Sequence, residues 1–375
     1  MSDNWEVVVL ENFAIIEMGQ SPSGETCNQD GVGIPLLNGP TEFGSYHPKP
    51  VQFTTDPRKF AFPNDILFCV RGSTTGRMNW ADQKYAIGRG IAAIRHRFGS
   101  EYRYFLKAII DFRLPELLAS ATGSTFPNVS REQLANLQCE IPPLPEQRAI
   151  AGILGALDDK IELNRRMNRT LESMARAVFR HWFVESEEVA SWKVGKLGDI
   201  CEFAYGKGLK EDERQAGSIP VYGSNGQIGW HNEYLVKGPG IVVGRKGNPG
   251  IVTWVQNDFF PIDTTFYVVP KAKEVSFYWL YYALLSLNLP DLGADSAVPG
   301  LNRNIAYMSD VPYPPNELMQ KFESFAKLLF DKMDVNEKES RTLAALRDAL
   351  LPKLMRGEVR VRPPQPVAPT NNQNK

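Results

Sequence analysis

Two stretches of the chain carry apolar residues at steps of three and four over several turns. In the first stretch these are Ile150, Leu154, Leu157, Ile161, Leu171, Met174 and Val178, with Asn164 at the centre. In the second they are Phe322, Ala326, Leu329, Met333, Leu343, Leu346 and Leu350, with Asn336 at the centre. This spacing places the apolar side chains on one face of a helix and is typical of a coiled-coil seam. Each stretch therefore predicts a helix of about 38 residues, roughly 57 Å long, whose apolar stripe needs a partner.

The second stretch is a diverged copy of the first. Pro142-Pro143 matches Pro314-Pro315 at the same offset of 172 residues that separates Asn164 from Asn336. Chance similarity between helices matches apolar positions rather than Pro-Pro or Asn, so the match indicates an internal duplication. An Asn on a helix seam costs stability but fixes the register, whereas an Asn at the edge of the stripe faces solvent. The sequence leaves both placements of the two asparagines open.

The duplication extends into the segments that precede the helices. The stretch WEVVVLENFAIIEMG (residues 5–19) resembles WKVGKLGDICEFAYG (192–206), and DILFCVRGSTTG (65–76) resembles GIVVGRKGNPG (240–250). The chain therefore consists of two tandem copies, each with a globular part of about 135 residues and a helical part of about 45.

The globular parts combine strand and helix signals. Short apolar runs bounded by Gly, Pro and Asn predict strands at 66–70, 241–243 and 266–269. Helical spacing predicts helices at 104–112 and 277–287. Because the order is not a regular βαβ alternation, we expect an α+β fold rather than a doubly wound sheet.

These patterns predict the domain organisation. The expected segments are a first globular domain at 1–140, a central helix region at 141–190, a second globular domain at 191–312, a distal helix region at 313–361 and a disordered tail rich in Pro and Asn at 362–375. If the second globular domain follows from the far end of the first helix, the two helices run antiparallel. The globular domains are then held apart at opposite ends of the pair, and the chain has an approximate two-fold axis of its own.

Composition and charge limit the function classes. Hydrophobic residues make up 43% of the 375 and charged residues 23%, as is ordinary for a globular protein, and no apolar run reaches the roughly 18 residues that cross a bilayer. The four cysteines show no metal-binding spacing, so we expect reduced, buried thiols and a cytoplasmic location. The net charge of -1 argues against a protein that holds DNA by bulk electrostatics alone.

Three motifs carry a resemblance to a known family. They are PPLPEQRAI (residues 142–150), DDKIELNRRMNRTLESMA (158–175) and LRDALLPKLMRGEV (346–359). Together with the repeat, they make the chain resemble the specificity subunit of type I restriction-modification systems from Trp5 to Val361. In the second copy, Asn316-Glu317-Leu318 stands near the place where Pro145-Glu146-Gln147 would be expected. The resemblance implies that each helix region carries a docking surface for a partner subunit, so the surface on the second copy is expected to differ in detail from that on the first.

The resemblance implies a subunit without catalytic chemistry of its own. Each globular domain would be a target recognition domain that reads one half of a split double-stranded DNA site. The helices would dock two methyltransferase subunits, and motor-nuclease subunits would join the complex. The assembled complex would then have DNA adenine methyltransferase and ATP-dependent endonuclease activity. S-adenosylmethionine, ATP and Mg²⁺ would be bound by these partners and not by this chain.

The residues themselves offer no competing catalytic site. The sequence has no N-P-P-Y methyltransferase motif, no G-x-x-x-x-G-K-[ST] phosphate loop and no metal-ligand spacing among its four histidines. We therefore expect a binding subunit for DNA rather than an enzyme. The alternative is a structural coiled-coil adaptor whose globular halves bind proteins.

Polar residues on Gly-rich turns are candidates for DNA contact, since Arg and Lys pair with guanine, Asn and Gln with adenine, and hydroxyls with phosphate. The candidates are Arg71, Ser73, Thr74, Thr75, Arg77, Asn79, Lys84, Arg89, Tyr222, Ser224, Asn225, Gln227, Arg245, Lys246, Asn248, Asn302 and Arg303, with Asn304 beside them. Solvated hairpin turns share this composition, so that interpretation stays open. On the central helix, Arg165, Arg166 and Arg169 suit a solvated face or a partner contact better than the DNA backbone.

Overall fold

A computed structural model describes residues 4–121, 127–293 and 300–361 of the chain. Its contacts divide the chain into two compact units, which we name the first unit (Met1–Leu163 and Glu339–Lys375) and the second unit (Asn164–Lys338). The division passes through both long helices, so each unit contains one globular domain and part of each helix. The segment boundaries expected from the sequence follow the order of the chain and stay a prediction. The tail expected to be disordered lies outside the described residues.

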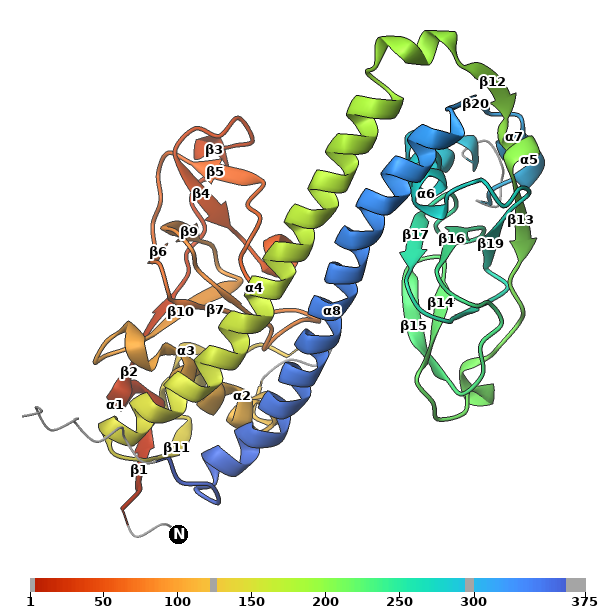
Figure 1. Cartoon of the computed structure of the whole chain (residues 1–375). Helices are drawn as coiled ribbons and strands as arrows, with labels where there is room; N and C mark the ends of the chain where they lie inside the picture. The colour runs from red at the N-terminus through yellow and green to blue at the C-terminus, as the bar shows by residue number, and fades with distance from the viewer. Residues whose placement is uncertain (1–3, 122–126, 294–299, 362–375) are drawn as a thin grey trace, which may run out of the picture. The chain divides into compact units, whose positions relative to one another are not determined.

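In the first unit, the described strands form three sheets (Figure 1). One pairs β1 (Glu6–Val9) with β11 (Gln138–Ile141). The second has the order β2 (Ala14–Met18), β10 (Ile91–His96), β7 (Ile66–Cys69), β8 (Met78–Trp80). The third has the order β3 (Cys27–Asn28), β5 (Gln52–Thr54), β4 (Ile34–Leu37), β9 (Tyr85–Ile87), β6 (Phe60–Ala61). The helices of this globular domain are α1 (Leu10–Phe13), α2 (Arg103–Ala119) and α3 (Arg131–Ala135).

The second unit repeats the two-stranded and four-stranded sheets, but its third sheet has three described strands where the first unit has five. One sheet pairs β12 (Lys193–Lys196) with β20 (Asp310–Tyr313). The second has the order β13 (Cys201–Tyr205), β19 (Thr265–Pro270), β16 (Gly240–Gly244), β17 (Val252–Val255). The third has the order β15 (Gly226–His231), β14 (Ile219–Gly223), β18 (Phe260–Pro261). Its helices are α5 (Leu197–Ile200), α6 (Phe277–Ser286) and α7 (Arg303–Tyr307). Even the parallel pair recurs, as β4 with β9 in the first unit and β14 with β18 in the second. The predicted α+β fold and the duplication are both confirmed.

The strands that lead into the Gly-rich turns are buried on both faces. In β7, Ile66 and Phe68 belong to the core shared with α2, whereas Leu67 and Cys69 belong to a second core on the other face. The alternation follows from the two-residue period of a strand. β16 shows the same alternation between two cores. The turns that follow these strands therefore start from fixed positions.

The long helices are α4 (Leu144–Phe183) and α8 (Asn316–Met355), each of 40 residues. In the first unit Asp158 pairs with Arg347 (2.6 Å) and Lys160 with Glu339 (3.1 Å), so residue numbers rise on one helix as they fall on the other. In the second unit, the ring centroids of Phe179 and Phe322 lie 5.7 Å apart, and the Asn168 side chain donates to Met333 O (3.1 Å). The predicted antiparallel pairing is confirmed within each unit. No helix in the described ranges is long and apolar enough to cross a membrane.

The two matched asparagines lie on the seam. Asn164 and Asn336 are each 1% exposed, and the amide of Asn164 donates to Asn336 O at 3.3 Å. The amide of Asn336 in turn donates to the side-chain oxygen of Asn168 at 2.8 Å. Their hydrogen bonds across the pair explain how polar groups are tolerated there. Solvent exposure of these asparagines, the open alternative, is excluded.

The predicted apolar seam is buried to different degrees. Leu154 and Ile161 are buried. The half-buried members are Leu157, Leu171, Leu329, Met333, Leu343 and Leu350. The seam positions predicted at Met174 and Leu346 are wrong, because these side chains are 46% and 47% exposed, whereas Ala175, the neighbour of Met174, is 0% exposed. An α-helix has 3.6 residues per turn, so a stripe read at fixed steps drifts around the helix over several turns.

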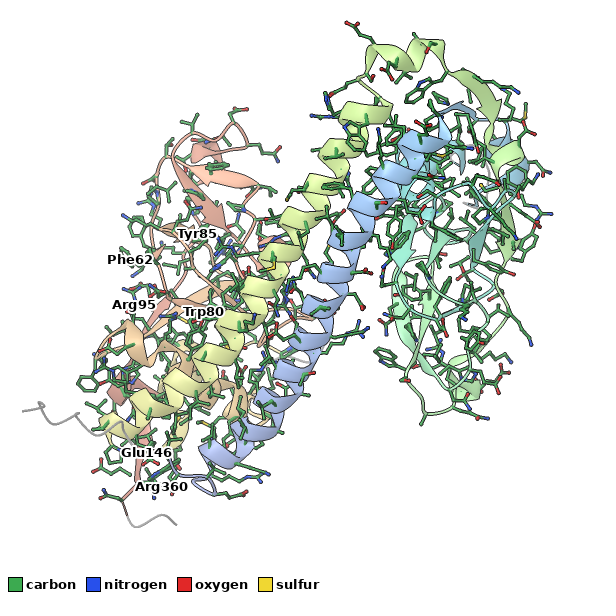
Figure 2. All side chains as sticks on the ribbon, viewed as in Figure 1. Phe62, Trp80, Tyr85, Arg95, Glu146 and Arg360 are labelled. Atoms are coloured by element: carbon green, nitrogen blue, oxygen red, sulfur yellow. The ribbon has the colours of Figure 1, made fainter. Side chains whose placement is uncertain are left out.

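The segment that follows α8 packs on the start of α4. The guanidinium of Arg360 donates to both carboxylate oxygens of Glu146 at 2.7 and 2.8 Å, and Figure 2 shows the two side chains directed at one another. The same guanidinium lies 6.0 Å from the ring centroid of Trp5. Leu354 and Met355, near the end of α8, are buried in the core of the first unit. The first unit is therefore completed by residues from the distal part of the chain.

Candidate nucleic-acid interface

The turn after β7 exposes three of the predicted side chains. The N–H of Val129 donates to Val70 O (2.9 Å) and fixes the start of the turn. Gly72 and Gly76 have φ values of 94° and 92°, a region in which a side chain would be strained. The predicted residues that project into solvent from this turn are Arg71, Ser73 and Thr74.

The other three predicted residues of this turn make contacts within the protein. The hydroxyl of Thr75 lies 2.8 Å from two backbone carbonyls, and this residue is 9% exposed. Asn79 is buried and its amide donates to Gly44 O at 3.1 Å. Arg77 is exposed, but its guanidinium donates to Phe43 O at 2.9 Å. These side chains hold the turn against a neighbouring loop, and their contact with DNA stays a prediction.

Arg89 and Lys84 lie at different places in the first unit. The N–H of Val70 donates to the carbonyl of the residue after Arg89 (3.0 Å), so the exposed Arg89 lies next to the turn. Lys84 lies with its ammonium 5.7 Å from the ring centroid of Phe62, a ring that Arg95 also contacts at 4.8 Å (Figure 2). Arg95 is paired with Asp65, the residue before β7, whereas the turn follows β7. Arg89 therefore lies beside the turn after β7, whereas Lys84 lies elsewhere in the first unit.

The turn after β16 has the same backbone frame as its counterpart. The N–H of Leu301 donates to Arg245 O (2.9 Å), as Val129 does to Val70 in the first unit. Lys246 forms an isolated β-bridge with Gly300, as Arg71 does with Asn128. The sequence predicted that these two turns are equivalent, and the backbone hydrogen bonds agree. What differs is the side chains that the shared frame presents.

Two arginines of the second unit lie on one exposed aromatic ring. The guanidinium carbons of Arg245 and Arg303 lie 5.1 and 4.7 Å from the ring centroid of Tyr205, which is 50% exposed. Arg303 also donates to Phe203 O at 3.3 Å. Each contact is a cation–π interaction that orients a guanidinium near the surface. A chain of net charge -1 thus concentrates two positive charges at one place, as phosphate or guanine contact requires.

Small polar residues surround this cluster. The N–H of Arg245 and the hydroxyl of Ser224 both donate to Thr264 O, at 2.9 and 2.6 Å. The amide of Asn248 donates to the side-chain oxygen of Asn225. Lys246, Asn225 and Asn248 are exposed. The structure therefore brings together predicted residues from the turns after β14 and β16 and from α7.

The remaining predicted residues of the second unit are less suited to DNA contact. The Asn302 side chain accepts from the N–H of Asn304 (2.9 Å) and caps α7. The exposed Gln227 donates to a backbone carbonyl two residues away at 3.3 Å. The half-buried Tyr222 packs edge-on against Phe259. Their roles toward DNA stay predictions.

Sequence reasoning missed Tyr205. It ends β13 directly before Gly206, and its counterpart in the first copy is Met18 before Gly19. An aromatic residue at the end of a strand, next to a glycine that both copies share, was the available signal. It did not suffice because the ring becomes informative only once the two arginines are known to lie on it.

The expectation of buried thiols holds for three of the four cysteines, whereas Cys27 is half-buried. Cys69, Cys139 and Cys201 are buried, and burial raises the pKa of the Cys139 and Cys201 thiols to about 12. Such thiols stay protonated and unreactive at neutral pH. In the described part of the chain, no group of three or more His, Cys, Asp or Glu side chains is placed to hold a metal ion.

The fold and the duplicated turns agree with a known family. The sequence model for the type I restriction modification DNA specificity domain matches residues 2–173 and 190–338. The chain therefore belongs to this family, as its motifs indicated. The two matched ranges include one copy each of the globular domain and more than half of the long helix that follows it.

Individual relatives support the same assignment. The chain is 24% identical to the type I restriction enzyme MjaIX specificity subunit of Methanocaldococcus jannaschii over an alignment of 423 residues, which covers 96% of the chain and 94% of the relative. It is 36% identical over 179 residues to the putative type I restriction enzyme MjaX specificity subunit of the same organism, covering 47% of the chain and 42% of the relative. The crystal structure of the type I restriction-modification S subunit from M. genitalium has the same fold, with a TM-score of 0.64, 24% identity and coverage of 94% and 97%.

Proposed function

We propose that this chain reads a split double-stranded DNA site, with one half read by each globular domain. The observation that carries the proposal is the pair of exposed turns after β7 and β16, which share one backbone frame and carry different side chains. Because the two turns have the same backbone conformation, each domain can present its turn to DNA in the same way. Their different side chains can then contact different bases. In the first domain the readers are Arg71, Ser73, Thr74 and Arg89; in the second they are Arg245, Lys246, Asn248 and Arg303 with Tyr205.

The chain contributes recognition, and partners contribute the chemistry. Two methyltransferase subunits dock on the surfaces that α4 and α8 form, and motor-nuclease subunits join them. The complex methylates adenine in the recognised site and cleaves unmodified DNA, with S-adenosylmethionine, ATP and Mg²⁺ bound by the partners in the cytoplasm. The near-neutral charge supports this division, because a chain of net charge -1 gains little from phosphate neutralisation and binds DNA tightly only with partners.

Methylation mapping of the reconstituted complex tests the proposal. The chain is assembled with its methyltransferase subunit, and methylated adenines are mapped in a random DNA library. Arg71→Ala should relax or abolish recognition of one half of the site, and Arg245→Ala of the other half, each with a roughly ten- to hundredfold loss. Arg58→Ala is the matched control, since Arg58 is an exposed arginine paired with Asp56.

The alternative is a structural adaptor whose globular domains bind proteins. It predicts that Arg71→Ala and Arg245→Ala leave DNA binding by the complex unchanged. Methylation of a continuous site would contradict the two-reader proposal, because one domain would then be idle. The two-reader proposal would also be contradicted if Arg71→Ala and Arg245→Ala altered recognition of the same half of the DNA site.

A further inference from the structure

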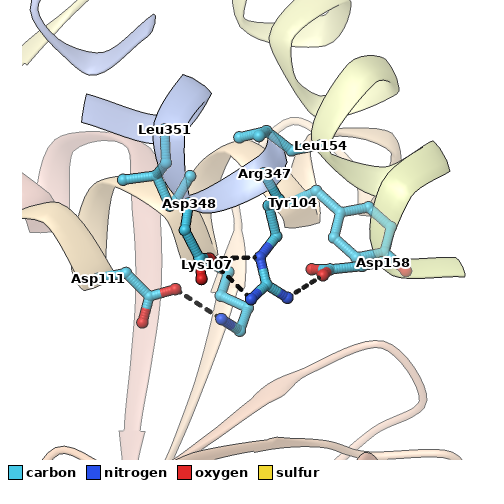
Figure 3. Close-up of a pocket in the computed structure, with 9 residues that line it drawn as sticks. Tyr104, Lys107, Asp111, Leu154, Asp158, Arg347, Asp348 and Leu351 are labelled. Atoms are coloured by element: carbon cyan, nitrogen blue, oxygen red, sulfur yellow. Dashed lines mark hydrogen bonds and ion pairs between the residues drawn. The ribbon is translucent and has the colours of Figure 1, made fainter. Parts of the chain in front are cut away.

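The first unit contains a charged pocket between α2, α4 and α8 (Figure 3). Its volume is about 340 Å³, within the range of pockets that hold a ligand or a large side chain. Residues from all three helices line it: Tyr104, Lys107, Ala108, Asp111, Leu154, Asp158, Arg347, Asp348 and Leu351.

The ionic groups of the pocket do not balance. Arg347 bonds to Asp158 (2.6 Å) and Asp348 (2.8 Å), and Lys107 bonds to Asp111 (2.5 Å), as the dashed lines in Figure 3 show. Three carboxylates thus face two cations, which leaves one negative charge. The side chains of Asp158, Lys107, Asp111 and Arg347 are 12%, 27%, 29% and 31% exposed, whereas that of Asp348 is 66% exposed, so the excess carboxylate lies where the pocket meets solvent. An excess negative charge at the opening of a partly enclosed pocket attracts a cation from solvent.

The second unit serves as an internal control. The repeat aligns Asp158 with Phe330 and Arg347 with Ala175, at the offset of 172 residues that relates α4 to α8. It aligns Lys107 with Tyr281, because α2 and α6 begin at equivalent residues. There, Phe330 and Tyr281 pack with ring centroids 6.0 Å apart and Ala175 is 0% exposed. The equivalent helices α6, α4 and α8 thus place rings and an alanine at the matched positions, so the fold itself does not require the charges in the first unit.

We propose that the pocket receives an arginine or lysine side chain from the methyltransferase subunit that docks on the first unit. This inference rests on the proposed function. The net negative charge selects a cation, and the carboxylates of Asp111 and Asp348 are the groups that bind it. Leu154 and Leu351 supply apolar walls for the aliphatic stem, as the long basic side chains require. The corresponding place in the second unit is occupied by its own aromatic rings, so the two docking surfaces differ by this anchor.

Titration of the purified methyltransferase subunit onto the full chain tests the proposal. Native mass spectrometry gives the number of copies bound, and calorimetry gives the affinity of each. The double variant Asp111→Asn, Asp348→Asn should weaken binding of the methyltransferase subunit that docks on the first unit at least tenfold, roughly the effect of removing a buried interface charge. Binding of the subunit that docks on the second unit should not change. Asp348→Arg should weaken binding to the first unit further, and α4 tolerates arginine at the matched position, Arg176. Asp212→Asn, the same change on a surface far along the chain, is the control.

The outcomes separate the inference from the function on which it rests. If the wild-type chain binds two copies and the double variant binds both with wild-type affinities, the proposed anchor is wrong while the docking function stands. If the wild-type chain binds no methyltransferase subunit, the docking function fails and the anchor with it. If putrescine raises the melting temperature of the wild-type chain but not of the double variant, and partner binding is unchanged, the occupant is a free organic cation and the proposal is overturned.

Discussion

The two units pack their globular domain against the long helices with different kinds of side chain. Where the globular domain meets the long helices, the first unit uses polar and ionic pairs: Asp158 with Arg347, and Tyr104 donating to Asp159. Burial and the hydrogen bond to Asp159 raise the pKa of Tyr104, which keeps this hydroxyl protonated. The second unit uses aromatic rings, with Phe330 packed edge-on against Trp254 and Tyr278.

The difference teaches which features a duplicated fold must retain. The backbone frames of the two turns, the order of the four-stranded sheets and the bounds of the long helices agree between the copies. The side chains between the helices and the globular domain differ, with charges in the first unit and rings in the second. Apolar replacements of a buried ion pair are often neutral or stabilising. The ion pairs of the first unit are therefore weak evidence of a gain in stability over the rings of the second.

The largest expected effect comes from matched core truncations. Ile150 and Phe322 occupy equivalent positions at the starts of α4 and α8, and each is 0% exposed. Ile150→Ala should destabilise the first unit by about 2–5 kcal/mol, and Phe322→Ala the second by about 3–5 kcal/mol. Hydrogen exchange measured by mass spectrometry assigns each loss to one unit. Equal loss of protection in both units after either change would show that they unfold as one.

Loss of an ionic pair should be smaller and sensitive to salt. Asp158→Asn weakens the bond to Arg347, which is partly exposed, so the first unit should lose about 1–2 kcal/mol. The difference from wild type should shrink in 1 M NaCl, because salt screens charges that water reaches. Phe330→Leu at the equivalent position of the second unit should cost a similar amount without salt dependence. Urea unfolding at two salt concentrations measures the loss of stability in both variants. If the loss caused by Asp158→Asn did not depend on salt, the ionic explanation would be wrong.

The aromatic platform should have a modest effect on DNA binding. Tyr205→Leu removes the ring on which Arg245 and Arg303 lie, with a loss of about 0.5–1 kcal/mol per cation–π contact. We expect the assembled complex to bind its site roughly five- to thirtyfold more weakly, as measured by fluorescence anisotropy. Met18→Leu, at the matched position of the first unit, is the control. An unchanged affinity for Tyr205→Leu would remove Tyr205 from the proposed interface.

The smallest expected effect is on pH dependence, and it belongs to the first unit. Burial lowers the pKa of His96 from its usual 6.5. Its Nδ1 accepts from the N–H of Phe98 (3.3 Å), so Nε2 carries the proton and lies 3.2 Å from the side-chain oxygen of Gln147. The unfolded chain binds this proton more readily, so the stability gained from neutral His96 is present above pH 6.5 and is lost as the pH falls through the folded pKa.

The matched position in the second unit is Pro270, which does not titrate. His96→Gln should therefore flatten the stability of the first unit between pH 7 and pH 5. Thermal unfolding followed across this range, with hydrogen exchange to identify the unit, measures the effect. A pH dependence that is unchanged by the variant would assign it to another group.

Periodicity and repetition predicted most of the fold. The helices, the strands at 66–70 and 241–243, and the antiparallel pairing all follow from apolar spacing, which the backbone period imposes. The placement of Met174 on the seam failed because the drift of a helix against fixed steps depends on what it packs against. The interface was harder to predict. Thr75 and Asn79 have the composition of DNA-binding residues, but their burial depends on loops whose contacts are distant in sequence.

The completion of the first unit by residues 339–361 sets an order of events during synthesis. The second unit is one continuous segment, so all its parts have left the ribosome once residue 338 has emerged. The first unit begins earlier but waits for Leu354, Met355 and Arg360 to close its core and bond Glu146. At about 5–20 residues per second, the N-terminal unit is exposed for many seconds with an open helix face. The half of the molecule whose translation begins first is thus the last to have all its parts available.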